Sequence, residues 1–379
     1  MVIETKRGKK FLLRASGVLV TAVAVVCFSI RLVPQVLLNQ NGTALTAAGF
    51  IMPEGAVEMI KNGYEDMQFT VSEVEQMIAE AEPVPSTTQS GESSAASESG
   101  ESAVSEPYTA PEPDLTVYEG TAYPINEIQI ANVGVKHENI TVRNGTDFEL
   151  DIAAELGLPP DVKIVKDGTP QVLIYHTHTG ESFLKTEMPN FYSSLETRSR
   201  DNSMNVVAVG EEIVKKLEAA GIGVIHDTTI HDDPYTGAYS RSAETIQRNL
   251  SEHPTIQVTI DVHRDALGGE TTRIKPTTVI NGRKAAQIMI LSGYDGDGSL
   301  GFPDWEMNLR LALRLQQSCV NVDPSFIRPL NFTDSRYNMN ATHGSLLVEF
   351  GTEVSAIDEV KYSGQLFGDA LVKTLETLM

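Results

Sequence analysis

Strand-like and helix-like patterns alternate along the chain from residue 170 to the C-terminus, and this alternation limits the fold more than any other feature of the sequence. The strand-like segments are short, apolar and rich in β-branched residues, which is typical of buried strands. They cover residues 172–175, 224–226, 256–262, 287–291 and 345–350. Apolar residues at helical spacing predict helices at 205–220, 240–252, 303–319 and 356–378. The alternation predicts an α/β fold with a largely parallel, doubly wound sheet and helices on both of its faces.

The first of these predicted strands ends in the segment HTHTGES, which begins at His176. His176 and His178 are two positions apart, so their side chains point to the same side of an extended chain. Glu181 follows after Gly180, where a glycine allows the loop to turn back. Two imidazoles and a carboxylate at a strand end are suitable ligands for Zn²⁺. The alternative is a pair of loop histidines that are hydrogen-bonded to the backbone.

Two later predicted strands also deliver chemically active residues. The strand at 256–262 contains Asp261 and leads into His263 and Arg264, and the strand at 345–350 contains Glu349. A carboxylate in the middle of an apolar strand is costly to bury unless it is paired, protonated or facing a metal ion. In sheets of this kind, ligands bind outside the C-terminal ends of the strands. We therefore expect the three strand ends to meet at one site.

The residue types at these strand ends predict zinc-dependent hydrolysis. His178, His263 and a carboxylate would hold Zn²⁺ and leave one coordination position open for water. Bound zinc lowers the pKa of that water toward about 7. Glu349 would then take the proton as a general base and pass it to the leaving amine.

Further residues are predicted to support this site. Asp261 lies two positions before His263, on the same face of the strand, and would orient its imidazole. Arg264 would steady a substrate carboxylate or an oxyanion; the alternative is a surface salt bridge with Asp265. The segment DPYTGAYSRS is predicted either to form a wall of the substrate site or to pack as a loop, through Tyr235, Tyr239 and Arg241.

The N-terminal part of the chain predicts a membrane anchor followed by a linker. Basic residues precede a mostly apolar run at 11–30, which is long enough to cross a bilayer with the N-terminus in the cytoplasm. A cleaved signal peptide is the alternative. Residues 83–114 contain no Lys or Arg and are rich in Ser, Glu and Pro, which predicts a disordered linker. The predicted order is a cytoplasmic tip and transmembrane anchor (1–32), a juxtamembrane segment (33–82), the acidic linker (83–114) and an extracytoplasmic catalytic domain (115–379).

The chain is strongly acidic, with a formal net charge of -22 at pH 7. This charge argues against nucleic acid as a partner.

The segments HTHTGES, TIHDDPYTGAYSRS, DVHRDA and LLVEFGTE, in this order, resemble the stage II sporulation protein P family. The resemblance covers the chain from about residue 139 to the C-terminus, and an N-terminal anchor with a linker fits it too. That family is similar in turn to the zinc-dependent N-acetylmuramoyl-L-alanine amidases, which share a doubly wound α/β domain.

The resemblance implies a membrane protein at the sporulation septum that cleaves peptidoglycan during engulfment. The implied activities are an amidase, which separates muramic acid from the stem peptide, and an endopeptidase, which cuts cross-links. The implied partners are a lytic transglycosylase and a polytopic membrane protein of the engulfment complex.

The resemblance also implies roles for individual residues. His178 matches the first histidine ligand of the amidases, His263 matches the later histidine ligand, and Glu349 matches the catalytic acid. The second amidase ligand has no clear counterpart, and Asp201, Glu181 or His176 would stand in for it.

Two rival functions remain from the sequence. One is a zinc peptidase that acts only on the cross-links. The other is a non-catalytic, membrane-tethered scaffold that binds the cell wall and activates a partner hydrolase. Metal content and wall digestion by a Glu349→Gln variant would distinguish the scaffold from an enzyme.

Overall fold

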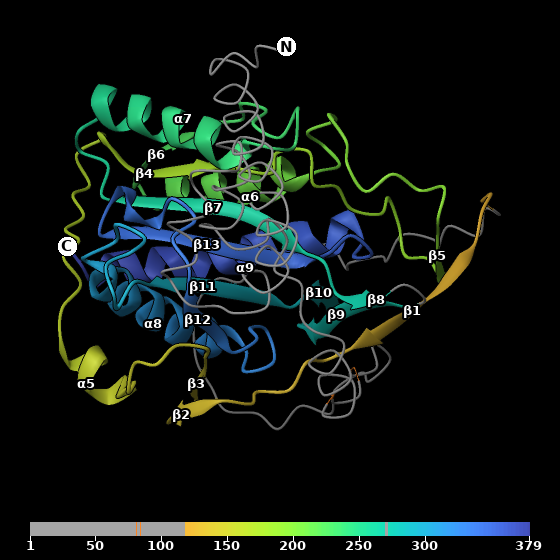
Figure 1. Ribbon diagram of the computed structural model, residues 1–379, viewed down its shortest axis with the longest axis horizontal. Coiled ribbons are helices and arrows are strands. Elements are labelled where there is room, and N and C mark those ends of the chain that lie inside the picture. The colour runs from red at the N-terminus through yellow and green to blue at the C-terminus, as the bar shows by residue number, and fades with distance from the viewer. Residues whose placement is uncertain (1–80, 82–83, 85–117, 270–271) are drawn as a thin grey trace, which may run out of the picture. The chain divides into compact units, whose positions relative to one another are not determined.

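The structure is a computed structural model that describes residues 81, 84, 118–269 and 272–379 (Figure 1). The predicted anchor, and almost all of the predicted juxtamembrane segment and linker, lie outside the described residues and stay predictions. Within the described residues, no helix combines the length and the apolar character that crossing a membrane requires.

The larger of two sheets has eight strands. In spatial order they are β2 (Val135–His137), β3 (Ile140–Asn144), β12 (Leu330–Asp334), β11 (Ile288–Tyr294), β13 (Gly344–Thr352), β7 (Val258–Asp265), β4 (Pro170–Tyr175) and β6 (Gly223–His226). The strands from β13 to β6 run parallel to one another, and so do β11, β12 and β3. Only the β11–β13 and β2–β3 pairs of this sheet are antiparallel among the described residues. The prediction of a largely parallel sheet is therefore confirmed.

Helices cover both faces of this sheet, as the sequence predicts (Figure 1). They are α5 (Ile152–Gly157), α6 (Val206–Ala219), α7 (Ala238–Glu252), α8 (Trp305–Val322) and α9 (Ile357–Glu376), with a short 3-10 helix η1 (Met339–Ala341). Successive residues of a strand point to opposite faces. Val172 and Ile174 of β4 join the core formed with α6, α8 and α9, whereas Leu173 and Tyr175 pack with Ile246 of α7. Each face of β4 is therefore covered by a different helix layer.

The ends of α6 show how local sequence sets helix boundaries. The side-chain oxygen of Asn205 accepts a hydrogen bond of 3.0 Å from the N–H of Val207, which caps the first turn. Gly221 adopts a left-handed φ of 73° just after the last turn, a conformation that favours glycine. The helix predicted at 205–220 therefore agrees with the structure to within one residue at each end.

The sequence does not predict the second, smaller sheet. Its strands are β5 (Asn190–Tyr192), β1 (Ala122–Ile128), β9 (Thr272–Ile280) and β10 (Arg283–Ala286), and β8 (Gly268–Gly269) pairs with β9. Local sequence predicts a strand at 127–130, which overlaps β1 only at residues 127 and 128. The β9 segment TRIKPTTVI interrupts its β-branched residues with Arg, Lys and Pro, so it lacks the apolar run of a buried strand.

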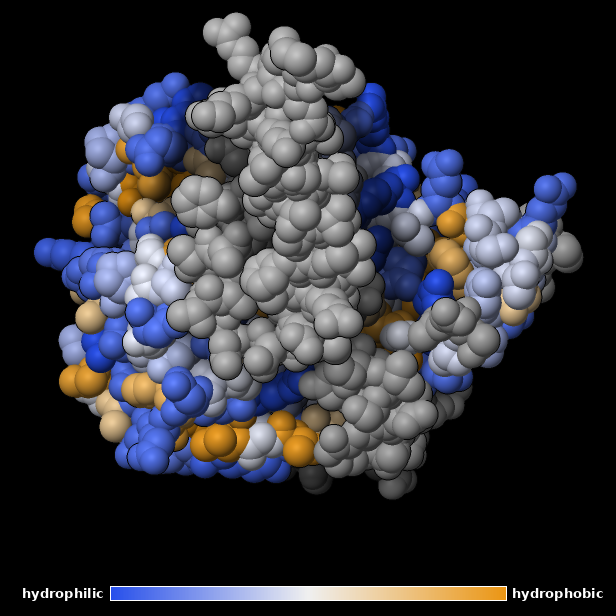
Figure 2. All heavy atoms as spheres, in the orientation of Figure 1, coloured by the Kyte–Doolittle hydropathy of each residue, from blue (hydrophilic) through white to orange (hydrophobic). Residues whose placement is uncertain are grey.

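Hydrophilic residues dominate the visible face of the described residues, and smaller apolar areas lie between them (Figure 2). Most large apolar side chains are instead buried between the sheets and the helices. This distribution of polar and apolar residues is the one expected for a solvent-exposed protein surface.

Candidate functional site

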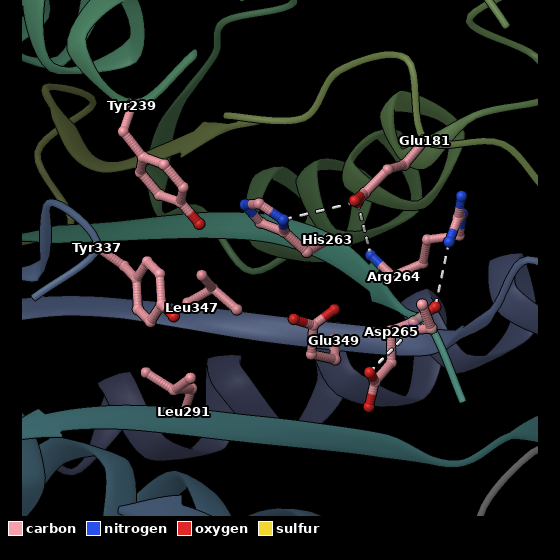
Figure 3. A pocket seen from close by; sticks show the side chains of 10 residues that line it. Glu181, Tyr239, His263, Arg264, Asp265, Leu291, Tyr337, Leu347 and Glu349 are labelled. Atoms are coloured by element: carbon pink, nitrogen blue, oxygen red, sulfur yellow. Dashed lines mark hydrogen bonds and ion pairs between the residues drawn. The ribbon is translucent and has the colours of Figure 1, made fainter. Parts of the chain in front are cut away.

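The neighbouring parallel strands β4, β7 and β13 end at one edge of the larger sheet, and the predicted site residues lie at or near these ends. Glu349 of β13 is the register partner of His263 of β7, and Leu347 is the register partner of Asp261. Register partners on adjacent strands point to the same face of a sheet. Glu349 and His263 therefore share one face, and Figure 3 shows both side chains at the same pocket.

His178 lies in the turn after β4, and its ring is fully buried. The ring centroids of His178 and His263 are 5.3 Å apart, and the two rings are close to perpendicular. Within the described residues, neither ring nitrogen of His178 has a hydrogen-bond partner. Burial lowers the pKa of His178 well below its usual value, so the ring is neutral. A neutral imidazole with unpartnered nitrogens is in the state that binds a metal ion.

Glu181 is buried beside His263, and its Oε2 lies 3.6 Å from Nδ1 of that ring. The backbone N–H of Arg264 donates a hydrogen bond of 3.0 Å to the same oxygen and fixes the carboxylate next to β7. Asp201, another alternative for the third ligand, is exposed and accepts hydrogen bonds from Ser203. The structure thus brings Glu181, and not Asp201, to the pocket.

His176 lies on the other side of the sheet, which corrects the prediction that it shares a side with His178. β4 ends at Tyr175 and the chain turns at once, so the two-residue repeat of an extended strand does not continue to His178. Nδ1 of His176 lies 3.1 Å from the carbonyl oxygen of Val262, and its Nε2 lies 2.9 Å from Nε2 of His226. Burial lowers the pKa of His176 to about 3. The contacts with Val262 and His226 engage both ring nitrogens of His176 away from the pocket.

Asp261 connects the two histidine motifs. Its Oδ1 lies 3.0 Å from Nε2 of His263. The same carboxylate accepts hydrogen bonds from the N–H and the hydroxyl of Thr177, at 2.8 and 2.6 Å. A carboxylate on the outer nitrogen of an imidazole fixes the orientation of the ring. Asp261 thereby leaves Nδ1 of His263 as the nitrogen that faces Glu181.

The guanidinium of Arg264 is buried and bonds within the protein. It donates hydrogen bonds to the carbonyl oxygens of Thr197 and Asp265, and it lies 3.8 Å from the carboxylate of Glu353. The carboxylate of Asp265 pairs instead with Arg328, at 2.9 Å. The alternative of a surface salt bridge between Arg264 and Asp265 is therefore wrong. Arg264 ties the segment around Thr197 to β7, and these bonds do not support a direct hold on a substrate carboxylate.

Glu349 faces a small pocket (Figure 3). The pocket is lined by Glu181, Tyr239, His263, Arg264, Asp265, Ala266, Leu291, Tyr337, Leu347 and Glu349. In the described part of the chain, Oε2 of Glu349 is buried without a hydrogen-bond partner. Burial raises the pKa of Glu349 well above its usual value; Asp265 adds to this shift, and His263 opposes it. A buried carboxyl with a raised pKa in a cleft is typical of a catalytic acid or base.

Several lining residues have no signal in the sequence. Leu291 and Leu347 are register partners on β11 and β13, and in sequence they look like ordinary core residues of apolar strands. Tyr337 reaches the pocket from a loop, where it has a left-handed φ of 39°. Arg328, which holds Asp265, comes from the connection between α8 and β12. Tertiary packing brings the lining residues together and sets Arg328 beside Asp265, so local sequence patterns do not reveal them.

The electrostatics of the pocket favour a positive charge beside His263. Burial lowers the pKa of His263, but the carboxylate of Asp261 raises it, with help from Glu181 and Glu349, to a net value of about 10. In the absence of another cation, the imidazole of His263 is therefore doubly protonated and positively charged, and it lies between carboxylates.

The donor set has the composition of a catalytic zinc site, with two imidazoles and one carboxylate. Two ligand atoms on one tetrahedral zinc ion lie roughly 3.4 Å apart, which is close to the 3.6 Å between His263 and Glu181. Among the described residues, however, no three His, Cys, Asp or Glu side chains are close enough together to form a complete metal site. The residue types and the unpartnered nitrogens of His178 fit zinc, whereas the three side chains would have to close up to share one ion.

Comparison with known sequences decides the family. The family model described as "Stage II sporulation protein P" matches residues 47–372. The chain belongs to the stage II sporulation protein P family. A stage II sporulation protein P of Bacillus subtilis (strain 168) is 25% identical over 210 residues, which are 52% of this chain and 49% of that protein. The chain thus aligns with about half the length of this relative.

Solved amidase structures show a distant similarity. N-acetylmuramoyl-L-alanine amidase AmiC2 of Nostoc punctiforme matches 55% of this chain and 96% of its own, with 10% identity and a TM-score of 0.31. The CwlD amidase from Clostridioides difficile, solved in complex with the GerS lipoprotein, matches 55% of this chain and 99% of its own, with 12% identity and a TM-score of 0.33. Similarity at this level says nothing about the chemistry of the site.

Proposed function

We propose that this chain is a zinc-dependent peptidoglycan hydrolase that cleaves amide bonds during sporulation. In this proposal it is an N-acetylmuramoyl-L-alanine amidase that also cuts peptide cross-links as an endopeptidase. Membership of the stage II sporulation protein P family supports a role in sporulation. One structural observation carries the chemical proposal: His178, Glu181, His263 and Glu349, from separate segments, gather at one edge of the sheet. Within the described part of the chain, both ring nitrogens of His178 and Oε2 of Glu349 are buried there without hydrogen-bond partners.

The residues proposed to hold the metal are His178, Glu181 and His263. Bound zinc would polarise the substrate carbonyl and lower the pKa of a water molecule toward about 7. The carboxylates around His263 raise its pKa and so favour a positive charge there, which supports a cation beside Glu181. A divalent ion at that place would supply the positive charge in place of the proton on the ring of His263.

Glu349 is proposed as the general base and then the general acid. The attacking water gives a proton to Glu349 while its oxygen forms a bond to the carbonyl carbon. The carbon–nitrogen bond then breaks, and Glu349 returns the proton to the leaving amine. Burial of Glu349 supports this role, because a raised pKa suits a carboxyl group that must both take and give a proton.

The other residues of the site act on these groups. Asp261 would hold the imidazole of His263 in one orientation, through the contact to its outer nitrogen. Its bonds to Thr177 would hold the turn that carries His178. Arg264 would fix Glu181 through its backbone N–H.

The proposed place of action is the outer side of the cell membrane at the sporulation septum. The anchor predicted at 11–30 and the linker predicted at 83–114 would tether the catalytic domain while letting it reach the wall. The family resemblance implies two partners, which we propose as well: a lytic transglycosylase that cuts glycan strands, and a polytopic membrane protein.

Digestion of purified sacculi tests this function. The full-length chain loaded with zinc should release stem peptides with a free L-alanine amine and should split cross-linked dimers, both measured by mass spectrometry. The Glu349→Gln variant should release neither product at a measurable rate. Full digestion by this variant would remove the proposed base. Wall binding without release by the wild-type chain would favour the tethered scaffold that activates a partner hydrolase.

A further inference from the structure

Tyr239, the second residue of α7, lies against both histidines of the pocket. Its ring is nearly parallel to that of His263, with centroids 6.4 Å apart and an interplanar angle of 12°. It meets the ring of His178 edge to face, at 5.5 Å. Figure 3 shows its hydroxyl pointing into the pocket, on the side of His263. A neutral hydroxyl donor therefore lies next to the proposed ligands, on the face that Glu349 shares.

The main chain around Tyr239 is held firmly. Its carbonyl oxygen accepts hydrogen bonds from the side chains of Asn338 and Ser242, at 2.9 and 3.1 Å. Asn338 also donates to the hydroxyl of Ser242, at 3.0 Å. Both Tyr337 and Asn338 adopt left-handed φ angles of 39° and 58°, which non-glycine residues rarely do. This strained loop fixes the start of α7 over the pocket, and a fixed donor is the kind that lowers a reaction barrier.

Several other hydrogen-bond donors near the pocket are engaged, whereas among the described residues Nε of Arg264 and two nitrogens of Arg328, Nε and Nη2, are buried without hydrogen-bond partners. The backbone N–H of Arg264 bonds to Glu181, and its guanidinium bonds to the carbonyl oxygens of Thr197 and Asp265. Arg328 pairs with Asp265. The pocket offers two phenol groups besides these donors, Tyr239 and Tyr337, and of these Tyr239 is the one that stacks on His263.

We propose that the hydroxyl of Tyr239 donates a hydrogen bond to the oxygen of the scissile carbonyl as that oxygen gains negative charge. This inference rests on the proposed amide hydrolysis. No bond to Tyr239 forms or breaks, and its proton stays on the phenol oxygen throughout. Tyr239 is thus a catalytic residue that touches the reacting oxygen, while Glu349 moves the proton.

The test compares Tyr239→Phe with a matched control, Tyr362→Phe, in the full-length chain; the hydroxyl of Tyr362 bonds to the carbonyl oxygen of Ile280, and Tyr362 does not line the pocket. Loss of one donor to a developing oxyanion lowers kcat by about 10²-fold or more. We expect this loss for Tyr239→Phe, with KM changed less than about threefold, and only a small change in kcat for Tyr362→Phe. A phosphinate analogue of the tetrahedral intermediate should bind Tyr239→Phe more weakly by a similar factor, and zinc content should not change.

Several other outcomes would each contradict the proposed role of the Tyr239 hydroxyl. A kcat within about threefold of wild type for Tyr239→Phe would show that the hydroxyl is not a donor to the reaction. Equal losses for the two variants, or failure of Tyr239→Phe to fold, would assign the hydroxyls to packing. If the wild-type chain and Glu349→Gln act alike on sacculi, the proposed hydrolysis itself fails and the donor role falls with it.

Discussion

Two histidine pairs lie on opposite sides of the larger sheet, and their surroundings differ sharply. His178 and His263 meet on the side of α7, where both nitrogens of His178 are buried without hydrogen-bond partners among the residues that the structure describes. His176 and His226 meet on the side of α6, where a Cβ on Gly210 would touch both rings. Here Nε2 of one ring lies 2.9 Å from Nε2 of the other.

In the second pair, His176 and His226, both ring nitrogens of His176 are engaged. Nδ1 of His176 lies 3.1 Å from the carbonyl oxygen of Val262, and Nδ1 of His226 lies 3.6 Å from the carboxylate of Glu211. A buried imidazole with both nitrogens satisfied is a structural group, whereas one with neither satisfied is prepared for a ligand. His176 and His178 are only two positions apart in the sequence, yet His176 has the surroundings of a structural group and His178 those of a ligand.

The largest expected effect comes from removing the proposed base, Glu349, which lies next to the first histidine pair, His178 and His263. Glu349→Gln keeps the size of the side chain but cannot take a proton, so kcat for release of stem peptides should fall by roughly 10³-fold. Zinc content should stay at the wild-type level, because Glu349 is not proposed as a ligand. Product release from sacculi and metal analysis of the same sample check both statements. A kcat close to wild type would mean that the first pair is not part of a hydrolytic site.

A smaller effect is expected from the carboxylate that orients His263. Asp261→Asn weakens the hold on the ring and on Thr177, so the zinc affinity should fall by about 10- to 100-fold. Competition with a chelator measures the affinity. Asp227→Asn is the matched control, since Asp227 follows β6 and bonds to Arg248, away from the first pair. Equal zinc affinities for the two variants would contradict the proposed role of Asp261.

The smallest expected effect concerns the second histidine pair, His176 and His226, and it changes the free energy of unfolding rather than the activity. The pKa of His176 falls from 6.5 to about 3 on burial, so between these values the unfolded state binds more protons than the folded state. Stability should therefore decrease as the pH falls through this window, by up to roughly 1.4 kcal/mol per pH unit from this residue. His176→Gln should lose less free energy of unfolding between pH 6.5 and 4.5 than the wild-type chain does.

Urea unfolding at several pH values measures this difference, and His343→Gln, at an exposed position, controls for the loss of an imidazole. Hydrolysis by His176→Gln at pH 7 should stay within about threefold of wild type, because the second pair does not reach the pocket. An unchanged pH slope would show that burial of His176 does not act on stability in this way.

The sequence predicts the larger sheet well because its strands are short apolar segments between amphipathic helices. The register that sets Glu349 beside His263 follows from adjacent parallel strands, which is why three strand ends could be expected to meet. The smaller sheet was not predicted, because strands such as β9 carry charged residues and a proline.

The individual roles within the motifs were harder to predict. The two-residue spacing of His176 and His178 indicates a shared side only if the chain stays extended, and the strand ends one residue before His176. The bonds of Arg264 to Thr197 and of Arg328 to Asp265 join segments far apart in sequence. Pairings of this kind depend on the packed fold and leave no trace in local patterns.

The most direct test is the zinc content of the full-length chain beside its His178→Ala, His263→Ala and His176→Ala variants. Our account predicts about one zinc per chain for the wild type and for His176→Ala. It predicts close to none for His178→Ala and His263→Ala after dialysis against a weak chelator. Zinc retained by His178→Ala and His263→Ala, or lost from His176→Ala alone, would contradict the claim that the first histidine pair and Glu181 hold one metal ion.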